Sequence, residues 1–215
     1  MPTAQQSKKI SKQLEAVETA ARDSKWFQVE TLALQTLEQA IAAEAFDLAA
    51  AACVPLREAR RQRAKQATDA AAGEVTILDA LEPEIESVEA GVYLLVPHAV
   101  GADARRLRLA GIQFEVPVLT VCREPETQMG TIPIVAIGAT TIRAYVDPPV
   151  DPEAPLLPWV VEAQVLLGNA ALEDIAESDL EPPQRIEALR AALDSVPDHE
   201  GLLDALRNAL QAMAG

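Results

Sequence analysis

The spacing of apolar residues changes twice along this chain of 215 residues. Up to about residue 70, apolar residues recur every three or four positions, which is the period of an amphipathic helix. From Gly73, short runs rich in Val, Ile and Leu predict buried strands, and after Pro158 the helical period returns. This order predicts a mixed α/β (α+β) fold, with helical hairpins before and after a small, three-layer-like sheet in the sequence.

The expected sheet is built from apolar runs at 74–78, 92–96, 116–122, 132–137 and 141–146. A helix expected to be capped by Asp103 separates the second run from the third, so these form a β-α-β unit with parallel strands. The last two runs are separated by a short turn at Gly138, too short for a crossover helix, and predict an antiparallel hairpin at the sheet edge. Between the first two runs, Glu82-Pro83 predicts the start of a short acidic helix.

Proline positions mark the expected boundaries. The segment 147–158 holds five of the chain's fifteen prolines, which predicts an extended, semi-rigid connector. Pro55 interrupts an otherwise helical segment, so a kink or a new helix start is expected near Val54. The resulting division is an N-terminal helical arm, an α/β module, a Pro-rich linker and a C-terminal helical arm, over 1–70, 73–147, 148–158 and 159–215.

Small residues lie where the helices of each arm would meet. Ala40, Ala49 and Ala50 do so in the first arm, and Leu167-Gly168 and Ala188 lie in a similar context in the last. A helix, a short turn and an Ala-rich helix in this order resemble the tetratricopeptide-like helical-hairpin repeats. This resemblance implies helices that present a surface for binding another protein.

The formal net charge of −15 disfavours nucleic acid as a partner, because the chain repels phosphates. Two Trp, two Tyr and three Phe also offer few surfaces on which bases could stack. One basic cluster stands out, and we expect it to be a solvated face near a helix C-terminus, where cations are favourable. Its members are Arg57, Arg60, Arg61, Arg63 and Lys65.

The two cysteines, Cys53 and Cys122, fit no metal-ligand spacing, so buried free thiols are expected and no metal or cofactor is predicted. The first twenty residues lack the apolar core of a secretory signal. No later window approaches the ~18 apolar residues of a membrane helix. These features predict a cytoplasmic location and no membrane partner.

Ligands of open α/β sheets bind beyond the carboxyl ends of the strands, which here selects the loops 97–103 and 122–126. His98 and Cys122 could meet there as an imidazole–thiol pair, although the spacing offers no third group to orient the imidazole. A second hypothesis is an anion at the helix N-terminus, although Asp103 would repel it. In that hypothesis Gly101 lets the backbone approach the anion, and Arg105 or Arg106 adds positive charge. The candidate ligand-binding residues of the whole strand-end site are Gly101, Asp103, Arg105 and Glu124. Solvated positions are expected for Glu82, Glu84, Glu86, Glu89 and His199.

Three functions follow from these patterns. The first is a non-catalytic protein-interaction or scaffold module that uses its helical-hairpin surfaces to bind a protein partner or a second copy of itself. The alternative is a small-molecule or anion-binding α/β domain, with or without catalysis, whose site lies at the carboxyl ends of the strands. The third is a homomeric assembly in which the hairpin from Ile132 to Val146 pairs with another chain.

Overall fold

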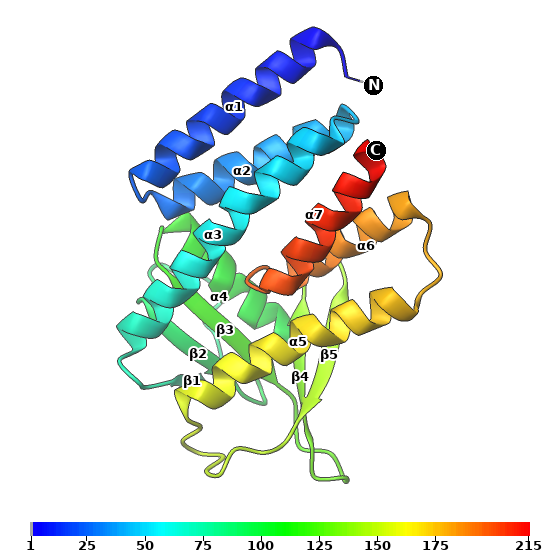
Figure 1. The fold of residues 1–215 in the computed structure, drawn as a ribbon. Helices are drawn as coiled ribbons and strands as arrows, with labels where there is room; N and C mark the ends of the chain where they lie inside the picture. Colours follow the sequence, from blue (N-terminus) through cyan, green and yellow to red (C-terminus); the bar gives the residue numbers. More distant parts are fainter. Residues whose placement is uncertain (1) are drawn as a thin grey trace. The chain divides into compact units, whose positions relative to one another are not determined.

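A computed structural model describes residues 2–215. Within this range the chain forms seven helices and five strands, which confirms the mixed α+β fold (Figure 1). The helices are α1 (Ala4–Arg22), α2 (Trp26–Ala42), α3 (Phe46–Ala71), α4 (Gly101–Gln113), α5 (Leu157–Glu177), α6 (Pro182–Ser195) and α7 (Glu200–Ala214). The strands are β1 (Thr76–Leu78), β2 (Gly91–Leu95), β3 (Val118–Arg123), β4 (Ile132–Ile137) and β5 (Thr141–Val146). No helix described between residues 2 and 215 is long and apolar enough to cross a membrane.

The chain divides into two compact units. The helical unit comprises Met1–Arg63, Asp179–Arg190 and Glu200–Gly215, and the sheet unit comprises Ala64–Ser178 and Ala191–His199. This division differs from the expected four parts, because the segment after the proline-rich connector is shared between both units. Helix α5, expected in a separate C-terminal arm, belongs to the sheet unit because it packs on β3, β4 and β5.

The sheet has the order β1-β2-β3-β4-β5. β1, β2 and β3 run parallel, and Leu95 lies opposite Cys122, so the predicted β-α-β unit around α4 is confirmed. β4 runs antiparallel to β3 and to β5, with Ile134 opposite Ala144, which confirms the hairpin. This hairpin places β5 at one edge of the sheet.

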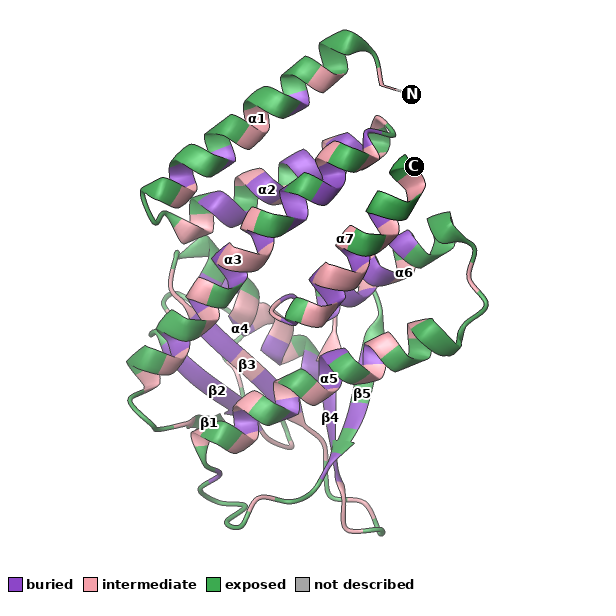
Figure 2. Ribbon diagram, viewed as in Figure 1, coloured by how far each residue is buried: buried purple, intermediate pink, exposed green. Residues whose placement is uncertain are grey.

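The two faces of the sheet are covered by different helices. Helix α4 contributes Ala104 and Leu107 to a buried cluster on one face. Side chains of β5 alternate between exposed and buried, and α5 packs on this strand, so α5 covers the opposite face (Figure 2). The strand residues of the α4 face are Tyr93, Leu95, Val118, Cys122 and Val135.

The prediction of a short acidic helix that starts at Glu82 is wrong, because residues 79–90 form no helix. Other parts of the sheet unit satisfy the carbonyl groups of this segment. Arg106 Nη2 donates to the carbonyl oxygens of Glu82 (2.6 Å) and Pro83 (2.5 Å), and Tyr93 Oη donates to that of Glu89 (2.7 Å). These three bonds hold an irregular crossover in place of the intrahelical bonds that the sequence pattern suggested.

Helix α3 runs without a break from Phe46 to Ala71, so the new helix start expected near Pro55 does not occur. Proline removes one helical donor and frees the carbonyl oxygen four residues earlier, which here belongs to Ala51. Ala51 is exposed, so water can reach this part of the helix. The solvated position makes the proline tolerable inside the helix.

The turns that end α1 and α2 are equivalent and lie 20 positions apart. Ser24 and Glu44 both have φ of 55°. The next residue in each turn donates its backbone N–H to a carbonyl five positions earlier, from Lys25 to Ala20 (3.0 Å) and from Ala45 to Ala40 (2.8 Å). This is the bond of a Schellman cap, and its recurrence sets the direction of α2 and α3 in the same way.

Burial follows the same spacing of 20 positions. Ile10, Glu30 and Ala50 are buried in α1, α2 and α3, and the residue after each of them is exposed. The equivalent exposed residues are Ser11, Thr31 and Ala51. The three helices therefore repeat one pattern of burial at this spacing.

The segment 191–199 closes the sheet unit by approaching two glycines. A Cβ on Gly138 would lie 2.6 Å from the Asp194 carbonyl carbon, and one on Gly168 would lie 2.0 Å from the His199 ring. The His199 ring also forms a hydrogen bond with Asn169 Oδ1 (3.2 Å). His199 is therefore buried, and its expected position on the surface is wrong.

Gly168→Ala should destabilise the protein by about 1–3 kcal/mol, because the new methyl group would overlap the held imidazole. Alanine's better helix propensity, worth about 1 kcal/mol, opposes this loss. Urea denaturation of both variants measures the balance, with Gly91→Ala as the control, since its Cβ would meet Tyr93 at an ordinary 3.9 Å. Equal stability of the two variants would show that the approach of His199 to α5 is not a tight contact.

Candidate functional site

The two residues proposed as a catalytic pair lie in different environments. His98 is exposed in the loop after β2 and has φ of 114°. Cys122 is buried in the apolar cluster beneath α4. Burial, together with the nearby carboxylates of Glu124 and Asp103, raises the pKa of the Cys122 thiol to about 11. A thiol with this pKa stays protonated at neutral pH and is a poor nucleophile.

Three of the four candidate ligand-binding residues are charged, and each has a partner within the sheet unit. Asp103 lies in the first turn of α4, where it accepts a hydrogen bond from the Val100 backbone N–H (3.0 Å). The helix begins at Gly101, so Asp103 is not the cap residue that the sequence suggested. Asp103 also pairs with Arg106 (3.1 Å), and Glu124 forms two bonds with Arg143 (2.7 and 3.0 Å).

Gly101 and Arg105 line a small cavity beside α4. Its volume is about 20 Å³, and a single water molecule needs roughly 10–15 Å³ by the same measure. A Cβ on Gly101 would lie 2.9 Å from the Ile137 side chain, so the first turn of α4 is packed against β4. The cavity has room for water and not for a metabolite. Its polar lining is Arg105, Arg108, Thr120, Gln164 and Ser195.

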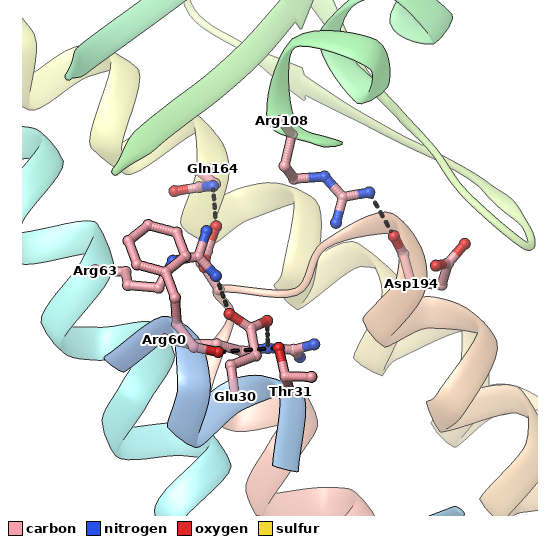
Figure 3. Close-up of polar contacts among 9 residues, drawn as sticks. Glu30, Thr31, Arg60, Arg63, Arg108, Gln164 and Asp194 are labelled. Carbon is pink, nitrogen blue, oxygen red and sulfur yellow. Dashed lines mark hydrogen bonds and ion pairs between the residues drawn. The ribbon is translucent and has the colours of Figure 1, made fainter. Parts of the chain in front are cut away.

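Asp194 bonds both arginines that line this cavity, Arg105 and Arg108. Arg105 Nη2 lies 3.0 Å from Asp194 Oδ2, and Arg108 Nη2 donates to the Asp194 carbonyl oxygen (2.7 Å; Figure 3). Ser195 Oγ donates to the Thr140 carbonyl oxygen (2.6 Å). These contacts attach the segment 191–199 to α4 and to the β4–β5 turn. Arg105 and Arg108 therefore stabilise the packing of this segment.

The helical unit contains a buried carboxylate that sequence reasoning missed. Glu30 of α2 binds Arg60 Nε through Oε1 (2.9 Å) and pairs with Arg63 through Oε2 (Figure 3). All three side chains are buried, and the Arg63 guanidinium lies 4.5 Å from the centre of the Phe27 ring. The interpretation of this basic cluster as a solvated face is therefore wrong for Arg60 and Arg63.

Two further ion pairs connect helices of this unit. Arg57 Nη1 of α3 lies 2.6 Å from Asp204 Oδ1 of α7, and Arg190 of α6 pairs with Glu38 of α2. Arg61 pairs with Glu58 on its own helix (2.8 Å). Both pairs between helices are partly exposed, so each contributes little to stability. The sequence signal was the combination of Glu30 on an apolar helix face with two arginines three positions apart.

Charge is divided unevenly between the units. The sheet unit carries 6 Lys and Arg against 20 Asp and Glu, a net charge of −14, whereas the helical unit carries 12 against 13, a net charge of −1. The four glutamates between residues 82 and 89 are exposed, as expected, although they lie on a loop. Within residues 2–215, no three His, Cys, Asp or Glu side chains come together as a metal-binding group.

Glu30→Gln should lower the free energy of unfolding by about 3–5 kcal/mol. The substitution replaces the carboxylate with a neutral amide and removes a negative partner of two buried guanidinium groups. The control is Glu58→Gln, which removes an exposed pair and should cost less than about 1 kcal/mol. Chemical denaturation of both variants provides the comparison. If both lose the same small amount, the Glu30 cluster contributes no more than a surface ion pair.

Both cysteines should resist alkylation by iodoacetamide in the folded protein. Burial raises the pKa of the Cys53 thiol to about 12 and that of Cys122 to about 11. At pH 8 the thiolate of Cys122 is then about one part in a thousand. Mass spectrometry should find slow labelling that becomes complete in urea. Rapid labelling of Cys122 with a midpoint near pH 7 would restore the nucleophile hypothesis.

No protein-family model, characterised protein or solved structure matches this chain. The contacts described above are therefore the basis for inferring what it does. They consist of a helical unit linked by ion pairs and a strongly acidic sheet unit in which Cys122 is buried and Asp103, Arg105 and Glu124 are paired.

Proposed function

We propose that this chain is a non-catalytic protein-interaction module. Its helical unit serves as a scaffold in the manner of tetratricopeptide-like hairpins, and its partner is another protein or a second copy of the chain. The observation that carries the proposal is that the turn that ends α1 at Ser24 is repeated 20 positions later, at Glu44, where α2 ends. Stacked units of this kind form extended surfaces and lack enclosed pockets, which suits binding to a polypeptide.

We assign binding to the exposed positions Ser11, Thr31 and Ala51 of this unit. These residues hold equivalent positions on successive helices, and their side chains are small, so a partner can approach the helices closely. The residues before them in the chain are buried, so each of the three lies next to the packed side of its helix. Small exposed side chains at these positions leave the helix backbones accessible to a partner.

The buried ion cluster supports a scaffold in a second way. Glu30 joins α2 to α3 through Arg60 and Arg63, so these helices hold their positions before a partner binds. A binding surface that is already ordered loses less conformational entropy on association. The rigidity of this unit thus favours recognition at its surface.

The state of the candidate reactive groups supports a non-catalytic role. The pKa of the Cys122 thiol is raised, and Asp103, Arg105 and Glu124 are engaged in pairs within the sheet unit. The cavity beside Arg105 holds no more than about one water molecule. Enzymes need groups with matched pKa values that face a space for substrate.

We also propose a cytoplasmic location. Cys53 and Cys122 are both free and buried, and free thiols persist in a reducing compartment. The net charge of −15 further favours protein partners over nucleic acid.

The double variant Thr31→Arg and Ala51→Arg tests the helical surface. Large charged side chains at these exposed positions should block close approach of the partner and reduce its recovery at least about tenfold, while thermal unfolding stays unchanged. Affinity purification with quantitative mass spectrometry measures the recovery, and light scattering gives the mass of the purified chain.

Ala102→Arg is the matched control, since Ala102 is also an exposed helical residue but lies on α4 of the sheet unit. Recovery of the partner should be the same as for the unaltered chain. A strictly monomeric chain that retains no protein, or equal losses for the control and the double variant, would contradict the proposed surface.

A further inference from the structure

Strand β5 is an edge strand with an open side. Among the strands described within residues 2–215, it pairs with β4 alone and ends the sheet. Its six residues are long enough to bond with another strand, and backbone N–H and C=O groups along an open edge can pair with an incoming chain.

This edge carries few of the features that prevent strand addition. Natural edges are commonly protected by lysines, prolines, bulges or short length. The sequence of β5, TIRAYV, contains neither lysine nor proline, and its register with β4 continues without interruption from Thr141 to Val146. Its one charge, on Arg143, is already paired with Glu124 (2.7 Å). The edge is therefore available to a partner strand.

Side chains around the edge indicate the chemistry of that partner. Tyr145 is 62% exposed on the face that α5 leaves uncovered, and its ring can receive a cation. The connector after β5 carries Asp147, Asp151 and Glu153, and no lysine or arginine follows Arg143 until Arg185. Exposed apolar side chains lie in the same connector and in the loop before β4, at Val150, Leu156 and Met129.

A second copy of the chain is a poor occupant of this edge. The sheet unit carries a net charge of −14, and pairing β5 with β5 of another copy would bring two such units within about one Debye length, roughly 8 Å at physiological salt. Like-charge contact opposes that assembly, whereas the same field attracts a cationic chain.

We propose that an extended, cationic segment of a partner protein adds to β5 as a sixth strand, with alternating basic and apolar residues. The basic side chains lie over Tyr145 and beside the acidic connector, and the backbone bonds extend the sheet. This surface extends the proposed function without depending on it, because it belongs to the sheet unit and the scaffold surface belongs to the helical unit.

The test uses the complete chain and an alternating Lys-Val peptide about as long as β5. Backbone hydrogen exchange should slow in β5 by at least about tenfold on binding, because its open edge acquires hydrogen bonds. Tyr145→Lys should weaken peptide binding by about tenfold or more, since it adds a like charge and removes the aromatic ring. Thr141→Lys repeats the charge test at another exposed position should Tyr145→Lys unfold.

Thr76→Lys on β1 is the matched control, because it makes the same charge change at an exposed position on the opposite edge strand. It should change binding less than about twofold. An alternating Glu-Val peptide should not bind. The Thr31→Arg and Ala51→Arg variant should bind the Lys-Val peptide normally, which separates this surface from the scaffold.

Four results would each overturn the proposal. They are unchanged hydrogen exchange in β5, equal weakening by Tyr145→Lys and Thr76→Lys, equal binding of the Glu-Val peptide, and a dimer of the unaltered chain that Tyr145→Lys abolishes. The second result would indicate general attraction to the acidic unit, and the last would identify a second copy as the occupant.

Discussion

The helical unit depends on a carboxylate that lies away from water. Glu30 is tolerable there because two guanidinium groups, from Arg60 and Arg63, meet its two oxygens. A buried ion cluster often adds little net stability compared with an apolar core, but it penalises any packing in which the charges separate. The alanines of α2 and α3 would by themselves permit many sliding arrangements. The charged cluster selects among them, so specificity of packing and a defined outer surface have a common origin.

The two units differ in net charge and in where their charged residues lie. The helical unit is close to neutral and holds its helices together with paired charges, whereas the sheet unit concentrates acidic residues on loops and helix surfaces around an apolar interior. The same division separates the two proposed binding surfaces. Small, uncharged side chains suit recognition by shape, and an acidic environment around an open strand suits recognition by charge and backbone bonding.

The sequence predicted β2, β3 and β4 well because they are apolar runs whose residues are mostly buried. The short spacing between 137 and 141 permitted only a hairpin, which also identified β5. It failed where a distant partner decides the outcome. The segment near Glu82 has a helical pattern, but Arg106 bonds its carbonyl groups. Arg60 looks like a surface residue until Glu30 is placed beside it, and His199 is buried because Gly168 lets α5 approach its ring. Of the candidate ligand residues, Gly101, Asp103 and Arg105 lie on the first turns of α4. Their pairing with neighbouring side chains could not be deduced from local spacing.

The spacing of 20 positions between the turns at Ser24 and Glu44 also bears on how such a chain can change in length. One helix and its Schellman cap form a module that ends in the same backbone geometry with which the next begins. Duplication of one module would therefore lengthen the array and leave the existing helix junctions intact. Duplication of a helix with its cap would add contact area while the new helix packs in the same way as the existing ones.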